Sequence, residues 1–337
     1  MMTNQRKIWG ADVLILLLVL CGAVVLSLSV GEVSIPFRKI AAFLSESESM
    51  EYGVLTYIRI PRTLLGFAVG GSLSLAGAIL QGIYRNPLVE PYTLGISGGA
   101  SLGVTLAIVT GLHFINSLFL PFAGFIGAFV TIFLVYTLSL RKGHIQINRM
   151  LLIGVMISFI ASSLMMFLMS VTSAENLHGI IFWTMGSLNE SNPLMIRTMV
   201  AISLLGVILS YLFVMPLNAL RLGEEKARHL GVNANMVIRI LFFITSLLAG
   251  ACIAVAGIVG FVGLVIPHIV RLWIGSDYRI LLISSFLSGS CFLILCDVAA
   301  RTIIPPNELP IGVITGIIGG IVFIVLLSRS TGKAKLS

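Results

Sequence analysis

Charged side chains are scarce in this sequence of 337 residues, because Lys, Arg, Asp and Glu together make up only 10% of it. A soluble globular domain carries roughly 25% charged residues. Hydrophobic residues reach 58%, and the mean hydropathy is +1.08. The composition excludes an ordinary soluble domain and predicts an integral membrane protein. The net charge of +8 does not indicate nucleic-acid binding, since the basic residues are scattered singly and form no stripe.

Motifs that would give the chain its own chemistry are also missing. The four cysteines form no CxxC pair, and the five histidines form neither HExxH nor a close cluster, which argues against a metal site. The one Gly-Lys dipeptide, Gly332-Lys333, lacks the upstream glycine and the following Ser or Thr of a phosphate-binding loop. We therefore expect no ATPase site, no cofactor and no metal in this chain. No nucleophile–base arrangement supports a membrane-embedded enzyme.

Long apolar runs fill most of the sequence, and a helix needs about twenty such residues to cross a bilayer. We predict an all-α membrane protein with about ten transmembrane helices, forming one domain over residues 1–337. Glycines at four-residue spacing, such as Gly66 and Gly70, predict close packing between these helices. The expected spans are residues 10–30, 61–83, 92–111, 117–140, 148–170, 194–215, 237–258, 260–275 (short, with Pro267), 279–300 and 308–328.

The distribution of Lys and Arg predicts the orientation of these spans. With the N-terminus inside and ten alternating spans, fifteen of the 21 Lys and Arg residues fall on the inner side and six on the outer side. Cytoplasmic loops of membrane proteins carry such an excess. We therefore expect both termini and the loop of residues 216–236 to lie in the cytoplasm.

One polar segment interrupts the apolar pattern: RLGEEKARHLGVNAN, residues 221–235. Its spacing predicts a short helix with a charged pair, an apolar side and a left-handed glycine end. The residues concerned are Glu224, Glu225 and Arg228 for the pair, Leu222, Ala227 and Leu230 for the apolar side, and Gly231 for the end. Because the chain has no energy source of its own, such a helix is a suitable contact for a separate motor domain.

An ion-driven secondary transporter is the alternative class. SLSLAGAI (72–79) and CIAVAGIV (252–259) are similar and lie in spans predicted to run in opposite directions, as in transporters built from inverted repeats. Such carriers usually have carboxylates inside the membrane. Asp297 is the deepest candidate, but Arg301 lies one helical turn on and predicts a local ion pair instead. The scarcity of intramembrane carboxylates favours a transporter powered from outside the chain.

Four stretches resemble the FecCD-like permeases, the membrane subunits of ABC importers for iron siderophores, haem and vitamin B12. They are RIPRTLLGFAVGGSLSLAGAILQGIYRNPLVEPYTLGISGGAS (59–101), LGEEKARHLGV (222–232), AGIVGFVGLVIPHIVRLWIGSDYR (256–279) and DVAARTIIPPNELPIGVITGIIGGIVFIVLL (297–327). The resemblance implies a type II importer fold in a bacterial cell membrane, surrounded by lipid. Its implied partners are a second permease subunit (identical or homologous), two cytoplasmic ATPase subunits that bind ATP and Mg, and an extracytoplasmic binding protein.

The resemblance also implies four groups of site residues. ATPase coupling falls to Leu222, Gly223, Glu224, Glu225, Arg228, Leu230 and Gly231; a second cytoplasmic contact to Arg85, Asn86 and Pro87; binding-protein docking to Arg59, Arg62 and Arg301; and an outer gate to Phe182, Trp183 and Met185. Arginine suits docking because its planar fork can hold a carboxylate with two hydrogen bonds. The alternatives are lipid contact for the arginines, a rigid connector for residues 85–95 and an interfacial anchor for residues 178–191.

The cargo is not written in the sequence. We expect a ferric siderophore first, then haem, then cobalamin. No iron ligands are expected in the chain, since the metal of such a cargo is already wrapped in its chelator.

Overall fold

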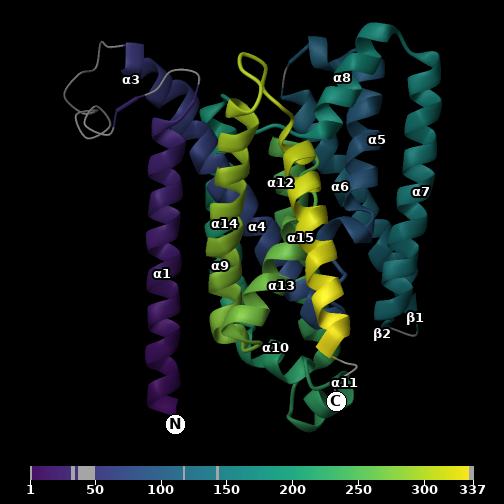
Figure 1. The fold of residues 1–337 in the computed structure, drawn as a ribbon. Coiled ribbons are helices and arrows are strands. Elements are labelled where there is room, and N and C mark those ends of the chain that lie inside the picture. The colour runs from purple at the N-terminus through teal and green to yellow at the C-terminus, as the bar shows by residue number, and fades with distance from the viewer. Residues whose placement is uncertain (1, 32–34, 37–49, 117, 142–143, 334–337) are drawn as a thin grey trace.

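The apolar runs form helices that stand side by side in one bundle (Figure 1). The structure, a computed structural model, describes residues 2–31, 35–36, 50–116, 118–141 and 144–333. The elements in chain order are α1 (Met2–Ser29), α3 (Met50–Val54), the π-helix η1 (Leu55–Arg59), α4 (Ile60–Tyr84), η2 (Pro91–Leu94), α5 (Ile96–Val109), η3 (Leu112–Phe114), α6 (Phe119–Ser139), β1 (Leu140–Arg141), β2 (His144–Ile145), α7 (Ile147–Val171), α8 (Ala174–Met185), α9 (Pro193–Tyr211), α10 (Val214–Leu220), α11 (Glu224–His229), α12 (Ala234–Ala256), α13 (Val262–Ile274), α14 (Tyr278–Thr302) and α15 (Ile311–Lys333).

The predicted number of spans is confirmed. In the described part of the chain, seven helices are long and apolar enough to cross a membrane, and three shorter apolar helices lie in α5, α13 and α15. Two predicted boundaries are wrong. The second span continues back to Met50 through η1, and the sixth ends at Tyr211, after which the separate helix α10 begins.

The two ends of the bundle differ. Figure 1 places α11, the start of α1 and the end of α15 at one end, and α3 and α8 at the other. We call these the α11 end and the α8 end. The expectation that both termini and the polar loop share one side agrees with this arrangement, while the identity of that side remains a prediction.

Helix α4 is the centre of the bundle, because it packs against α14, α12, α13 and α9. Its contact with α14 depends on small residues: a Cβ added to Gly70 would lie 2.3 Å from the carbonyl oxygen of Gly289. Beside this contact, the Ser290 hydroxyl donates to the carbonyl of Phe67 at 2.7 Å. The predicted close approach at Gly70 is therefore confirmed, and it brings polar backbone groups of two helices together inside the bundle.

The chain breaks its helical path between α12 and α13. Helix α12 ends at Ala256, and α13 begins after Phe261, whose φ of 67° is left-handed. Within α13, Pro267 has no N–H to donate to the carbonyl four residues earlier, that of Gly263. The Gln81 side chain of α4 replaces that donor, with its Nε2 lying 3.2 Å from the oxygen of Gly263 and 3.1 Å from that of Leu264.

Replacing Gln81 by Leu tests this substitution of donors. Gln81 is buried, so Q81L leaves buried carbonyl oxygens without that partner, and we expect a loss of about 1–3 kcal/mol in stability. The measurement is the thermal melting temperature of the detergent-purified protein, with Q146L at the exposed N-cap of α7 as control. Equal melting temperatures for Q81L and the wild type would contradict the assignment.

Candidate functional site

The predicted polar helix exists as α11, and its expected glycine end is confirmed. Gly223, with φ 110° and ψ 151°, starts it in a region that L side chains rarely adopt, and Gly231 ends it at φ 81°. Ala227 is fully buried beneath the helix, and its carbonyl accepts from the N–H of Val232 at 3.0 Å. The short helix thus packs against the bundle at Ala227, and a glycine stands at each of its ends.

Two details of that expectation are wrong. Among the described residues, no ion pair involves Glu224, Glu225 or Arg228. An exposed helical pair contributes only about 0.3–0.5 kcal/mol, which does not hold long side chains in one place. The expected apolar side is also split: Ala227 packs inward, whereas Leu222 and Leu230 are 54% and 64% exposed. The exposed surface here therefore consists of the charged residues of the helix and the two leucines that flank it.

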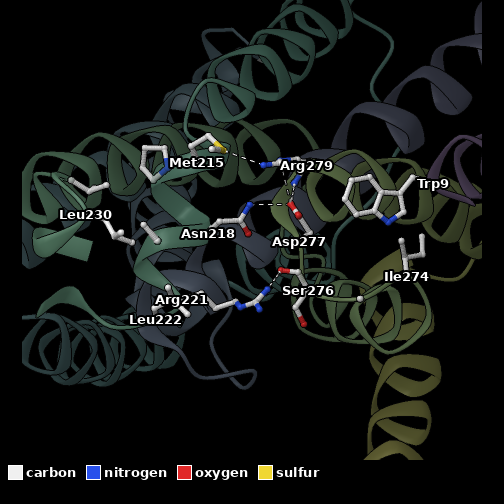
Figure 2. A pocket seen from close by; sticks show the side chains of 14 residues that line it. Trp9, Met215, Asn218, Arg221, Leu222, Leu230, Ile274, Ser276, Asp277 and Arg279 are labelled. Carbon is white, nitrogen blue, oxygen red and sulfur yellow. Dashed lines mark hydrogen bonds and ion pairs between the residues drawn. The ribbon is translucent and has the colours of Figure 1, made fainter. Parts of the chain in front are cut away.

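A cavity of about 880 Å³ lies beside α11, between α10 and the turn before α14 (Figure 2). Leu222 and Leu230 line one side of it, and Trp9 of α1 lines the other. Asn218 of α10 donates from Nδ2 to Oδ1 of Asp277 at 2.9 Å. Arg221 donates from its guanidinium to the carbonyl of Ser276. These bonds tie the base of α11 to the start of α14.

The second predicted contact, Arg85, Asn86 and Pro87, directly follows α4. Arg85 caps that helix in a left-handed conformation, with φ 49° and ψ 35°. A Cβ added to Gly223 would lie 3.4 Å from its Nη1, so the two segments predicted to face a cytoplasmic partner adjoin each other.

The connector that follows, residues 88–95, does not stay at the surface as expected of a simple turn. The Glu90 carboxylate accepts from the backbone N–H of Phe261, and burial raises the pKa of this carboxyl to about 7. The Tyr92 hydroxyl accepts from the N–H of Val259 at 3.3 Å. Both side chains thus supply acceptors to the break between α12 and α13. Sequence reasoning missed these roles, and Gln81 with them, because the partners lie more than 160 residues away.

The three arginines predicted for docking gather at the α8 end, where they are buried rather than exposed. Arg62 binds two carboxylates: its Nη2 lies 2.9 Å from Oδ1 of Asp297, and its Nη1 lies 2.7 Å from both carboxylate oxygens of Glu308. Arg301 forms the expected local pair with Asp297, with 3.0 Å between Nε and Oδ2. Asp297 is buried, whereas the Glu308 side chain is 46% exposed.

The remaining contacts of this cluster reach the end of α1. Arg59 donates to the carbonyl of Leu28, and Arg301 donates to the Ser27 hydroxyl at 3.1 Å. A small cavity of about 150 Å³ opens between Arg59, Arg301 and Glu308. The structure therefore brings all three arginines together and pairs two of them, Arg62 and Arg301, with carboxylates. One of these carboxylates, Glu308, was not singled out from the sequence, although its stretch was.

The predicted gate segment is helix α8, which the Ser173 hydroxyl caps by accepting from the N–H of Asn176. Of its three expected gate residues, Phe182 is 54% and Met185 37% exposed, while Trp183 is partly buried. After the helix, the carbonyl of Gly186 accepts from the N–H of Ile311 at 3.2 Å, and the N–H of Ser187 donates to the carbonyl of Ala256 at 2.9 Å. The end of α8 is thereby bonded to the starts of α15 and of the α12–α13 break.

A cavity of about 200 Å³ connects this helix to the arginine cluster, since Arg62, Phe182, Gly186 and Glu308 all line it. Arg62, predicted for docking, and Phe182, predicted for the gate, are far apart in the sequence but line the same cavity. In the described part, no group of three or more His, Cys, Asp and Glu side chains is placed to hold a metal ion.

Comparison with known proteins agrees with this arrangement. The FecCD transport family model matches residues 16–329. The hemin transport system permease HmuU of Yersinia pestis is 37% identical over 96% of each chain. The vitamin B12 import permease BtuC of Klebsiella pneumoniae is 36% identical, over 98% of this chain and 96% of the relative.

Solved structures show the same fold. A structure assigned to the metal-chelate type of ABC transporter, in an inward-facing conformation, superposes with a TM-score of 0.85 at 32% identity, covering 96% of this chain and 99% of the other. PsaBC of Streptococcus pneumoniae shares the fold, with a TM-score of 0.54 at 17% identity over 85% of this chain and 94% of the other. A multi-pass membrane bundle with a family match along most of its length leaves one assignment: the chain belongs to the FecCD transport family of ABC importer permeases.

Proposed function

We propose that the chain, paired with a second permease subunit, forms the pore of a bacterial importer that moves a ferric siderophore into the cell. Two cytoplasmic ATPase subunits would dock at the α11 end, and a binding protein outside the cell would deliver the cargo at the α8 end. Both termini would then lie in the cytoplasm. The observation that carries this proposal is the two-ended geometry, with an exposed polar helix at one end and an arginine cluster beside the predicted gate at the other.

The choice of cargo lies within one chemical class, a metal held by a large organic chelator. The metal-chelate type of the similar structure supports that class. The hemin and vitamin B12 permeases among the relatives make haem and cobalamin the second and third candidates.

Helix α11 suits ATPase coupling because it is exposed on its outer side and bonded to the bundle on its inner side. Ala227 is buried, and Arg221 at its base is bonded to the turn before α14. A displacement of α11 by a docked subunit is therefore passed to α10 and α14 and is not absorbed by a loose loop.

Docking of a binding protein at the α8 end requires an exchange of carboxylates. Arg62 is already held by Asp297 and Glu308, and only Glu308 is substantially exposed. An acidic side chain of the binding protein would replace Glu308, leaving Asp297 to hold Arg62 in place. Glu308 lies three residues before Ile311, whose N–H donates to the carbonyl of Gly186 directly after the predicted gate helix. Release of Glu308 would therefore act on the segment that is bonded to the gate.

Charge reversal in α11 tests coupling. E224R places a cation where an acidic side chain now starts the helix, and we expect transport-linked ATP hydrolysis to fall at least ten-fold, roughly 1.4 kcal/mol or more. The measurement is cargo-stimulated ATPase activity of the reconstituted importer, with R149E, an exposed charge reversal near the start of α7, as control. Full activity in E224R would argue against α11 as the coupling element.

The carboxylate exchange predicts opposite effects from two substitutions. E308Q removes the competing charge and should tighten binding-protein affinity a few-fold, whereas R62E should weaken it at least ten-fold and reduce its salt dependence. Affinity is measured with the permease in nanodiscs at several salt concentrations, and R197E on exposed Arg197 of α9 is the control. The same affinity for E308Q and the wild type would contradict the exchange.

The cargo is identified by uptake of labelled ligands in cells lacking the gene, with and without its restoration. Restored uptake of hydroxamate or catecholate ferric siderophores, abolished when ATP is depleted, is the expected outcome. Restoration by haem or cobalamin alone would transfer the assignment to that cargo.

A further inference from the structure

The α11 end contains a second cavity, of about 330 Å³, whose charged lining is entirely basic. We call it the cationic pocket and define it by Arg85, Arg221, His268 and Arg271. Arg85 comes from the end of α4, Arg221 from the segment before α11, and the other two from α13. Gln81 and Tyr278 complete the wall toward the bundle.

The three arginines of the cationic pocket have no carboxylate partner in the described part of the chain, where no ion pair includes any of them. Arg221 uses part of its guanidinium on the carbonyl of Ser276. Asp277 turns instead toward the larger cavity (Figure 2), where its Oδ1 accepts from Asn218 and from the backbone N–H of Arg279, each at 2.9 Å. Within the described ranges, the basic groups of the pocket therefore have no carboxylate counter-ion.

That arrangement suits an anion. Arg85 and Arg221 are exposed, whereas Arg271 and His268 are partly buried, so an anion from outside the chain can reach all four basic groups. Like charges gathered in one site repel one another. An anion bound between them would reduce this repulsion and accept hydrogen bonds from several guanidinium groups at once.

The backbone of Arg85 is a second, independent sign of function. Arg85 occupies the left-handed position after α4, where glycine is the usual residue because it has no Cβ. A side chain retained at such a position costs free energy, and such outliers cluster at functional sites. This conformation places the guanidinium of Arg85 beside the start of α11, since its Nη1 lies 3.4 Å from where a Cβ on Gly223 would be.

We propose that the cationic pocket receives an acidic side chain of the ATPase subunit that docks on α11. This inference rests on the proposed function and adds to it the chemistry of the contact. The pocket is lined by residues 85–87, one of the two segments that would face the ATPase, and by Arg221, which directly precedes the other. Arg85 also lies beside Gly223 at the start of α11. A carboxylate fits because it can accept from two guanidinium groups together, and a side chain on the docked subunit enters and leaves with that subunit.

The test uses the full-length chain in detergent, its cognate ATPase subunit, and binding measured at low and high salt. R85G keeps the left-handed backbone without strain and removes one guanidinium, so loss of folding does not confound the result. R271Q removes a second guanidinium from another helix. The control is R149Q, which neutralises an exposed arginine near the start of α7 that does not line the pocket.

We expect R85G and R271Q each to weaken ATPase binding about ten-fold and to flatten its salt dependence, with R149Q unchanged. Wild-type affinity and salt dependence in both pocket variants would overturn the inference while leaving the proposed function intact. Failure of the wild type itself to bind the ATPase would overturn the proposed function. Inorganic phosphate is the probe for a free anion: phosphate binding lost in R271Q, with ATPase binding unaffected, would also overturn the inference.

Discussion

Every backbone N–H and C=O inside a bilayer needs a partner supplied by the protein, and this requirement governs the structure at the places where its helices stop. The path from α12 to α13 is broken between Ala256 and Val262, so its free groups must be satisfied from elsewhere. Glu90 and Tyr92 do this from one side, and Ser187 does it from the other, while Gln81 supplies a donor to the first carbonyls of α13. The position of the connector before α5, and that of the end of α8, follow from these bonds.

The spans could be predicted from the sequence because a run of about twenty apolar residues is recognised from contiguous residues alone. The same holds for the glycine end of α11, since a left-handed residue after a short helix depends on its neighbours alone. Helix α5, with 14 residues, and α13, with 13, are too short to cross by themselves, and the irregular segments before them supply the remaining length. Such segments follow no hydrophobic period, so the sequence does not mark where they meet the helix.

Site residues were predictable only where they belong to a recognisable stretch. Arg62 and Arg301 were named from the sequence, yet their burial was not foreseen, because Arg62 pairs with Glu308 across 246 residues of chain and Arg301 bonds Ser27 across 274. The role of Gln81 could not be predicted, since the sequence does not show whether a lone glutamine in an apolar helix has a hydrogen-bond partner. Long-range polar pairing is a property of the folded bundle and leaves no spacing in the sequence.

The two arginine clusters differ in whether the chain itself supplies carboxylate partners for the guanidinium groups. At the α8 end, Asp297 and Glu308 pair with Arg62, and Asp297 also pairs with Arg301, so these two guanidinium groups have carboxylate partners within the chain. At the α11 end, Arg85 and Arg271 have no such carboxylate among the described residues. An arginine paired within the chain must exchange its carboxylate before it binds a partner, whereas exposed Arg85 and partly buried Arg271 need no such exchange.

The break between α12 and α13 is hydrogen-bonded toward both ends of the bundle, to the connector at Tyr92 and to Ser187 after α8. A free energy that couples two sites acts equally in both directions. If a partner bound at one end shifts the backbone of residues 256–261 and so changes the affinity of the other end, a ligand at that other end changes the affinity of the first by the same factor. A shift of this short irregular segment would therefore couple binding at the two ends of the bundle in both directions.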